Sequence, residues 1–267
     1  MQGRLLPPEN GRIQSFPIKS WRDEFPSAKR LKLELIEWTI DRQGLFQNPI
    51  LTRVGQAEIN ELQMQHGVYV KSITCDNLMQ APVHKHGPQG ITKNSELLKF
   101  LDHLPVLDRL ILVWPIVDDG RVSTKDEMSN LVQIVNKIAD ICREKGIILA
   151  FETDFTPEEN GIFLSNFPED VVGINLDLGN SASYGNSIIE DFALNKDRVF
   201  NIHIKDRNYG GTTVPLGEGD VPWIDFAEKA LPFFDGNLIL QCARQSTISE
   251  VETIRRYLDF LSLKGLV

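Results

Sequence analysis

The stretch Asn201-Ile202-His203-Ile204-Lys205-Asp206 predicts a short β-strand with one apolar and one polar face. Successive side chains of a strand point to opposite faces, so Ile202 and Ile204 share one face while the other face carries Asn201, His203 and Lys205. An imidazole and an ammonium on the inner face of a buried strand are costly unless that face forms a site. We therefore expect a functional site at the end of this strand.

Three further strand-like segments end in a polar residue in the same way. They are residues 147–152, ending at Glu152, residues 172–177, ending at Asp177, and residues 238–241, ending at Gln241. Two carboxylates, an imidazole and an amide oxygen are a ligand set suited to a divalent cation. The pattern predicts one divalent-metal site, with Glu152, Asp177, His203 and Gln241 as its ligands.

Strand-like and helix-like segments alternate along the chain. The clearest helix begins after the capping box Thr124-Lys125-Asp126-Glu127 and ends at Gly146. Residues 110–114 are almost continuously apolar, as in a strand buried on both faces. About eight such units in roughly 250 residues fit a closed barrel, and no glycine-rich dinucleotide fingerprint follows the first strand. We predict an α/β fold, a (β/α)8 TIM barrel, formed by a single domain spanning residues 1–267.

The composition excludes several classes of function. Apolar residues make up 42% of the 267 residues and charged residues 24%, as in ordinary globular proteins. A net charge of -9 and a pI near 5.1 argue against a nucleic-acid partner, which needs a basic surface. No apolar run is long enough to span a membrane, and the N-terminus has no apolar signal-peptide core. Cys75, Cys142 and Cys242 lie far apart, which indicates reduced thiols. We expect a cytoplasmic protein, and the sequence leaves open whether it forms a homo-oligomer.

Several stretches together carry a resemblance to a known family. They are Met1-Gln2-Gly3-Arg4-Leu5, Ile36-Glu37-Trp38, Phe151-Glu152, Leu176-Asp177-Leu178-Gly179-Asn180, Ile202-His203-Ile204-Lys205-Asp206 and Leu216-Gly217-Glu218-Gly219. In this order they resemble the xylose-isomerase-like TIM-barrel superfamily, particularly its sugar phosphate isomerase/epimerase branch. The resemblance implies one divalent metal, usually Mn²⁺ or Mg²⁺, with Zn²⁺ or Co²⁺ as alternatives. Glu152, Asp177 and His203 match the first three of the family's four ligands.

Two positions depart from the sugar epimerases of that family. Gln241 stands where they have a fourth ligand, a Glu, and Asn180 stands where they have a His. A carboxamide does not exchange a proton near neutral pH, so Gln241 cannot be the second acid/base group of a two-base epimerase. Its amide oxygen can serve as a neutral ligand, or it can hydrogen-bond a metal-bound water instead.

Other polar and aromatic residues are candidates for the same site. The candidates for contact with substrate are Arg4, Glu37, Trp38, Asp76, Trp114 and Arg244. For the two tryptophans, packing at the barrel mouth is the alternative to stacking on a sugar. Lys205 is expected to polarise a substrate oxygen or to act as an acid, and a salt bridge with Glu152 or Asp177 is the alternative.

Two expectations concern segments outside the ligand set. His84 and His86 lie in a segment rich in proline and glycine and are expected to be exposed loop residues. The first barrel strand is expected to be short, because Met1 begins almost where the family's strand ends, unless the natural start lies upstream. Gln2 and Arg4 would then lie near the mouth of the barrel.

These features favour a divalent-metal-dependent isomerase or epimerase-like enzyme acting on a small sugar or sugar derivative, whether phosphorylated or not. The metal would stabilise an enediolate, with Glu152 as the base and Lys205 as electrophilic help. One alternative is a dehydratase acting on a polyol or keto sugar through the same enediolate. Another is a sugar-binding barrel without turnover, which Gln241 suggests. The small number of histidines and the negative charge disfavour a nucleic-acid phosphodiesterase.

Overall fold

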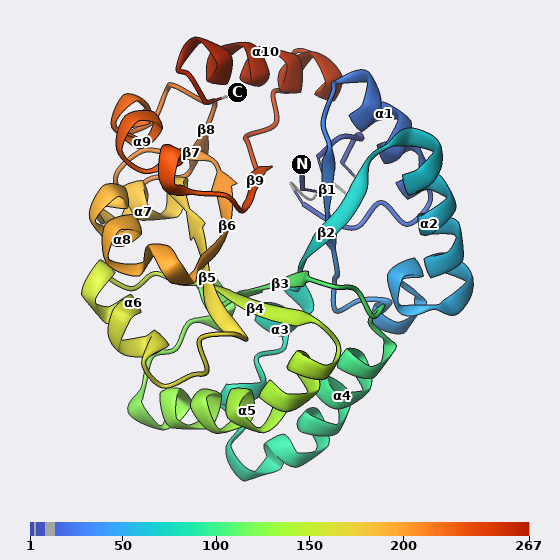
Figure 1. Cartoon of the computed structure of the whole chain (residues 1–267), viewed down its shortest axis with the longest axis vertical. Helices are drawn as coiled ribbons and strands as arrows, with labels where there is room; N and C mark the ends of the chain where they lie inside the picture. Colours follow the sequence, from blue (N-terminus) through green and yellow to red (C-terminus); the bar gives the residue numbers. More distant parts are fainter. Residues whose placement is uncertain (3, 9–13, 267) are drawn as a thin grey trace.

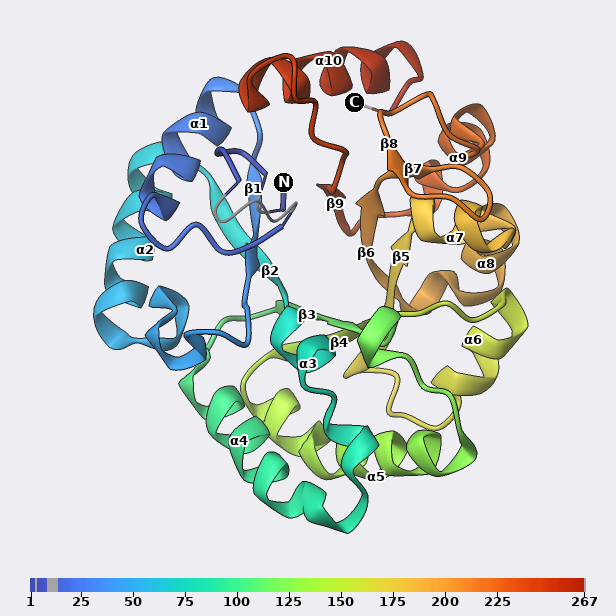
Figure 2. The same cartoon turned by 180° about the vertical axis from the view of Figure 1, so that it is seen from behind.

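The computed structural model describes residues 1–2, 4–8 and 14–266, with the backbone alone at residues 87–94. In this part of the chain the helices are α1 (Glu24–Arg30), α2 (Arg53–His66), α3 (Asp76–Gln80), α4 (Gly90–His103), α5 (Lys125–Glu144), α6 (Pro157–Leu164), α7 (Leu178–Tyr184), α8 (Ile188–Asn195), α9 (Trp223–Lys229) and α10 (Glu250–Leu263). The strands are β1 (Leu35–Thr39), β2 (Tyr69–Thr74), β3 (Leu110–Pro115), β4 (Ile147–Glu152), β5 (Val172–Asp177), β6 (Val199–Ile204), β7 (Asp206–Arg207), β8 (Thr213–Val214) and β9 (Asn237–Leu240). Figures 1 and 2 show the helices as a ring around the strands.

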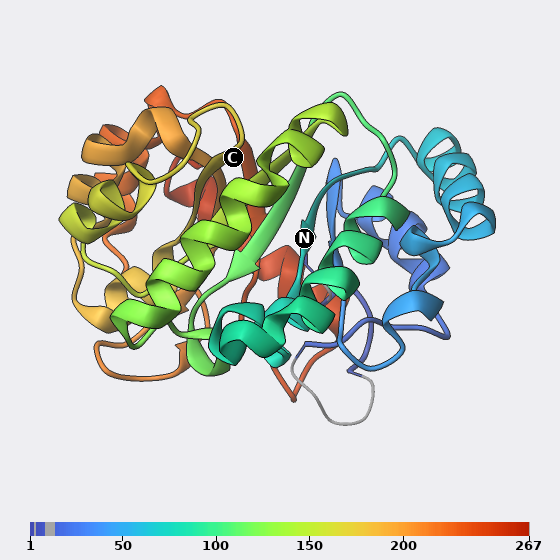
Figure 3. The same cartoon turned by 90° about the horizontal axis from the view of Figure 1, so that it is seen from below.

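The main sheet has seven parallel strands that follow the order of the chain, β1-β2-β3-β4-β5-β6-β9. Each crossover helix therefore leads to the neighbouring strand, and α4 and α5 run side by side on the outside (Figure 3). The short antiparallel pair β7–β8 lies in the connection between β6 and β9. Because the strands are parallel, their C-terminal ends lie at the same end of the barrel. This arrangement confirms the predicted TIM-barrel fold.

Gln2 lies between the two edge strands of the main sheet. It forms a parallel bridge with Glu37 of β1, whose N–H donates to the carbonyl oxygen of Met1 at 2.9 Å. On its other side, the N–H of Gln2 donates to the carbonyl oxygen of Leu240 at 3.0 Å. Figures 1 and 2 both place the N-terminus between β1 and β9. Met1 and Gln2 thus bridge β1 and β9 through backbone hydrogen bonds.

Helix α5 shows how local sequence signals set the outer layer. The Thr124 side chain accepts from the N–H of Glu127, and the Glu127 carboxylate accepts from the N–H of Thr124. Its apolar side, which packs on β4, includes Leu131, Val135, Ile138 and Cys142. Gly146 follows with φ +67°, and an added Cβ would lie 2.1 Å from the carbonyl oxygen of Leu107, so only glycine fits. Among the described residues, no helix combines the length and the apolar character needed to cross a membrane.

The inside of the barrel changes from apolar to polar along the strands. A small apolar cluster of Ile111, Val113, Ala150 and Phe200 is separate from the main core, which lies between the sheet and the helices. Further toward the C-terminal ends, the inward positions are polar and almost fully buried. They are Asn175 and Asp177 on β5, and Asn201 and His203 on β6. Buried polar groups need hydrogen-bond partners, and these side chains bond to one another, except that Asn201 Oδ1 has no partner among the described residues.

The expectation that His84 is an exposed loop residue is wrong. The residue lies in a 3₁₀ segment, Val83–Gln89, and its side chain is fully buried, whereas His86 two residues later is exposed. Burial lowers the pKa of His84 to about 4, because the charged imidazolium is poorly solvated there. The proline and glycine residues around His84 correctly predicted an irregular segment. They did not predict that the His84 side chain is buried.

This burial makes a testable contribution to acid sensitivity. The unfolded chain protonates His84 below its ordinary pKa of about 6.5, while the folded protein does so only near 4, so stability is lost as pH falls between these values. The largest loss attributable to this group is about 3 kcal/mol. We expect the unfolding free energy of His84→Gln to fall less than that of the parent between pH 7 and pH 4.5 in urea titrations. His86→Gln is the matched control, and an identical pH dependence of His84→Gln and the parent would rule this account out.

Candidate metal centre and active site

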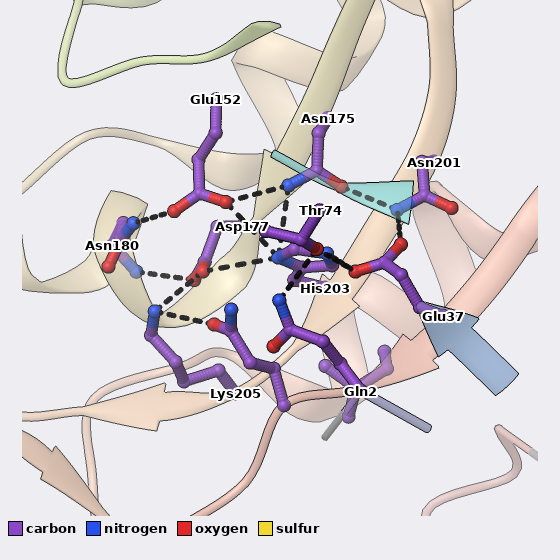
Figure 4. A network of polar contacts seen from close by, with 12 residues as sticks. Gln2, Glu37, Thr74, Glu152, Asn175, Asp177, Asn180, Asn201, His203 and Lys205 are labelled. Atoms are coloured by element: carbon purple, nitrogen blue, oxygen red, sulfur yellow. Dashed lines mark hydrogen bonds and ion pairs between the residues drawn. The ribbon is translucent and has the colours of Figure 1, made fainter. Parts of the chain in front are cut away.

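Glu152, Asp177 and His203 meet at the C-terminal ends of the neighbouring strands β4, β5 and β6 (Figure 4). Each offers one ligand atom, and these atoms lie within 4.8 Å of one another. The Nδ1 atom of His203 lies 3.2 Å from Glu152 Oε2 and 3.7 Å from Asp177 Oδ2. All three side chains are buried. The structure therefore brings together three of the four predicted ligands, from segments spread over more than fifty residues of sequence.

Lys205 links the fourth predicted ligand to this group. Its Nζ atom donates to Asp177 Oδ2 at 2.6 Å and to Gln241 Oε1 at 2.8 Å. Lys205 directly follows β6 and Gln241 directly follows β9, so both project from neighbouring strand ends. Of the two salt bridges considered for this lysine, the structure contains the one with Asp177. The Lys205 ammonium is thus shared between the amide oxygen of Gln241 and one carboxylate oxygen of Asp177.

Two asparagines hold the carboxylate of Glu152. The Nδ2 atom of Asn180 donates to Oε1 at 2.7 Å, and Nδ2 of Asn175 donates to Oε2 at 3.0 Å. Asn180 is fixed in turn by its own N–H, which donates to Asp177 Oδ1 at 2.8 Å and makes Asp177 the cap of α7. Its Oδ1 atom accepts from Arg207 Nη1 at 2.8 Å. Asn180 therefore orients Glu152, the predicted base.

Glu37 lies behind His203, on the side away from Glu152 and Asp177. Its Oε1 atom is 2.7 Å from His203 Nε2 and also accepts from the hydroxyl of Thr74 at 2.6 Å. Its Oε2 atom accepts from Asn201 Nδ2 at 3.0 Å. Gln2 extends the network, because its Nε2 atom donates to Thr74 Oγ1 at 2.6 Å. Both oxygens of Glu37 are thus engaged inside the barrel (Figure 4).

The charges of the site stabilise one another. Burial alone would raise the pKa of Asp177, but the charge of Lys205 and the hydrogen bonds of His203 and Lys205 bring it below its ordinary value. The pKa of Glu37 is also lowered, since the charge and hydrogen bond of His203 outweigh its burial. Burial opposes a charge on His203, but Glu37, Asp177 and Glu152 raise its pKa well above the usual range. The carboxylates of Asp177 and Glu37 therefore stay negative near neutral pH, as a cation site requires.

Arg4 and Asp76 lie near the mouth and are joined by one side chain. Arg4 donates to the carbonyl oxygens of Gln241 and Cys242, and its Nη2 atom donates to Gln14 Oε1 at 3.2 Å. Gln14 Nε2 donates to Asp76 Oδ2 at 2.9 Å. Burial, with the nearby charge of Asp41, raises the pKa of Asp76 to about 7. Both residues thus lie near the mouth, and contact of each with a substrate stays a prediction.

Arg244 and the two tryptophans point elsewhere. Arg244 donates to the carbonyl oxygen of Leu6 at 2.8 Å and to Glu250 Oε1 at 3.2 Å, toward α10. Trp38 and Trp114 are each about 1% exposed and belong to the core outside the barrel. The Trp38 ring lies 5.5 Å from that of Trp21, and the Trp114 ring stacks on Phe151 at 5.3 Å. This placement favours the packing alternative for both tryptophans and disfavours stacking on a sugar.

Sequence reasoning missed several members of the polar network. Asn175 precedes Asp177 by two residues and Asn201 precedes His203 by two, so each pair shares one face of its strand. That spacing places Asn201 on the predicted polar face beside His203, and it was a usable signal for Asn175 as well. No comparable signal marks Thr74, or Arg207 beyond the end of β6, because their partners come from distant segments.

The donor set fits a hard divalent cation. Carboxylate and amide oxygens are ligands for Mn²⁺ and Mg²⁺, and an imidazole nitrogen is accepted by Mn²⁺. The ligand atoms of Glu152, Asp177 and His203 already lie close enough to share one ion. A cation placed among them and Gln241 Oε1 would take over the oxygens that now bind Lys205 Nζ.

Comparison with known proteins agrees with the fold. Residues 28–262 match the family model described as xylose isomerase-like TIM barrel. A probable L-ribulose-5-phosphate 3-epimerase of Mycoplasma pneumoniae is 23% identical over 219 residues, which cover 76% of this chain and 68% of that protein. The fold is also similar to D-psicose 3-epimerase from Clostridium cellulolyticum H10 with D-tagatose (TM-score 0.73, 14% identity, 92% of this chain and 94% of that one). A xylose isomerase-like TIM barrel protein from Mycobacterium smegmatis in complex with magnesium gives a TM-score of 0.67 at 18% identity over 99% of this chain and 95% of the other. The chain therefore belongs to the xylose isomerase-like TIM barrel family.

Proposed function

We propose that this protein is a divalent-metal-dependent isomerase or epimerase that acts on a small sugar or sugar derivative. The observation that carries the proposal is the convergence of Glu152, Asp177 and His203, whose ligand atoms lie within 4.8 Å at the C-terminal ends of three adjacent strands. Catalytic residues of TIM barrels come from this end of the strands. The similarity to a probable pentulose-phosphate epimerase supports a sugar as the substrate class.

Glu152 is the base that would remove a proton from the carbon next to the substrate carbonyl. Asn175 and Asn180 each donate to one of its oxygens, which fixes the plane of the carboxylate. A bound Mn²⁺ or Mg²⁺ would supply electrophilic stabilisation to the carbonyl and adjacent hydroxyl oxygens, and so to the enediolate. The residues of this chain then have two tasks, which are to orient the substrate and to move the proton.

Lys205 is the candidate for electrophilic help from the protein. Its ammonium is held by Asp177 and Gln241 at the centre of the site, and the residue as a whole is 7% exposed. From this position it can donate a hydrogen bond, or a proton, to a developing oxyanion. We therefore assign to Glu152 the removal of the carbon-bound proton, and to Lys205 the donation of a hydrogen bond or a proton to the substrate oxygen.

The neutral Gln241 favours a reaction on one face of the substrate. Its carboxamide cannot carry a proton to the opposite face. Aldose–ketose interconversion through a cis-enediolate needs a base on one face only, which Glu152 provides. Epimerisation with inversion would require Lys205 as the second acid.

Hydrogen exchange with solvent tests this function. The Mn²⁺-loaded protein, incubated in D₂O with free and phosphorylated pentoses and ketohexoses, should incorporate deuterium at the carbon next to the carbonyl of its substrate. Glu152→Gln should reduce the exchange rate at least about 100-fold. Glu158→Gln, at an exposed position on α6, is the matched control.

Mass and stereochemistry of the product separate the alternatives. An aldose–ketose pair labelled on one face supports the one-base isomerase, whereas inversion at one carbon indicates epimerisation assisted by Lys205. A product lighter by one water would replace the isomerase with a dehydratase. Sugar binding without any exchange would leave a barrel that binds but does not turn over, against the proposal.

A further inference from the structure

We propose that Glu37 is a positioning residue that fixes the ring of His203 so that its Nδ1 atom faces the metal centre. This inference rests on the proposed function, because it assigns to Glu37 a role in holding a metal ligand. It differs from the substrate-contact role that its strand-end position suggested. The geometry that carries it is the contact of 2.7 Å between Glu37 Oε1 and His203 Nε2.

The two nitrogens of His203 point in opposite directions, each toward carboxylate oxygens. The Nδ1 atom points toward Glu152 Oε2 and Asp177 Oδ2, at 3.2 and 3.7 Å. The Nε2 atom points toward Glu37, on the side away from these two ligands (Figure 4). Only a nitrogen without a proton can bind a metal, so a proton held on Nε2 leaves Nδ1 free for the ion.

Glu37 is itself held rigidly enough for this task. Its side chain is 1% exposed, and it accepts from Thr74 Oγ1 at 2.6 Å and from Asn201 Nδ2 at 3.0 Å. Asn201 is fixed in turn, since its Nδ2 atom also donates to Asn175 Oδ1 at 2.7 Å. Both carboxylate oxygens of Glu37 already accept hydrogen bonds. Its Oε1 atom is placed to accept a further hydrogen bond from the N–H at Nε2 of His203.

The arrangement has a general physical consequence. A carboxylate behind a ligating histidine fixes the tautomer, orients the ring and makes the nitrogen that binds the metal more basic. Removing such a partner commonly costs 10- to 100-fold in metal affinity. The barrel closure at Gln2 contributes to the same support, because Gln2 donates to Thr74, and Thr74 donates to Glu37.

Metal titration of Glu37→Gln tests the assignment. After removal of metal with a chelator, calorimetric titration with Mn²⁺ should show one site in the parent and binding at least about tenfold weaker in Glu37→Gln. Glu37→Asp, which keeps the charge, should recover part of the affinity. Glu24→Gln is the matched control, because Glu24 is another buried glutamate, at 3% exposure on α1, and should bind Mn²⁺ like the parent.

Nitrogen NMR of the imidazole provides a readout that a merely structural role would not move. In ¹⁵N-histidine-labelled protein loaded with Zn²⁺, we expect the His203 proton on Nε2, shifted downfield by Glu37, and no proton on Nδ1. Glu37→Gln should lose the downfield signal while keeping its fold by circular dichroism.

The outcomes separate this inference from the proposed function. Parent-like Mn²⁺ binding by Glu37→Gln, or a proton found on Nδ1 of the Zn²⁺-loaded parent, overturns the role of Glu37 and leaves the metal-dependent function standing. Failure of the parent to bind Mn²⁺, Mg²⁺ or Zn²⁺ overturns the proposed function, and the positioning role with it.

Discussion

Replacing Asp177 with asparagine should weaken the binding of Mn²⁺ or Mg²⁺ at least about 100-fold and abolish turnover. The site has two carboxylate ligands, so this change removes half of the negative charge that offsets the ion. Asparagine keeps an oxygen that can cap α7 at Asn180, which separates loss of charge from loss of the cap. Elemental analysis of the purified variant and calorimetric titration with Mn²⁺ measure the effect.

The design needs a control for the general loss of an aspartate. Asp197→Asn changes an exposed aspartate and should retain the metal content and activity of the parent. Asp177→Ala should be less stable than Asp177→Asn, because alanine also removes the side-chain oxygens that accept from the N–H of Asn180 and from Lys205 Nζ. Undiminished metal content in Asp177→Asn would remove this residue from the ligand set.

Replacing Lys205 with methionine should change metal affinity and turnover in opposite directions. The Lys205 ammonium binds Asp177 Oδ2 and Gln241 Oε1, so it competes with an incoming ion for the same oxygens. Without that charge, Mn²⁺ should bind about tenfold more tightly, and the thermal stabilisation produced by Mn²⁺ should increase. Turnover should nevertheless fall about 100-fold or more, because the hydrogen-bond donor for the oxyanion is lost.

Two further variants make this result specific. Lys205→Arg retains the charge and should not gain metal affinity. Gln241→Glu adds a carboxylate next to Lys205 and should also tighten metal binding. This variant keeps the Lys205 ammonium. If Lys205→Met instead loses metal affinity, or keeps full activity, Lys205 has neither of the roles assigned here.

The convergence of Glu152, Asp177 and His203 could be predicted from the sequence because parallel strands end together. Glu152, Asp177 and His203 each end or nearly end a strand-like segment, and a barrel places such ends around one mouth. The alternation of side chains along a strand also decides which residues of β1 can face the barrel interior. Trp38 follows Glu37 directly, so the two must point to opposite sides of β1, and only one of them can face the barrel interior.

Other features depend on contacts that local sequence does not encode. Glu37 and His203 are 166 residues apart, and their pairing requires closure of the barrel. That closure involves Gln2, for which no strand of normal length could be predicted. The burial of His84 depends in a similar way on its packing, although the residues around it correctly indicate an irregular segment.

The central claim is that one divalent cation binds among Glu152, Asp177 and His203 and displaces Lys205 from Asp177. Anomalous diffraction from crystals grown with Mn²⁺ tests it most directly. The account predicts one anomalous peak per chain, in contact with Glu152, Asp177 and His203 Nδ1 and facing Gln241, with Lys205 Nζ moved away from Asp177 Oδ2. A protein that shows no peak at this position, with the Lys205–Asp177 pair intact at saturating Mn²⁺, would contradict it.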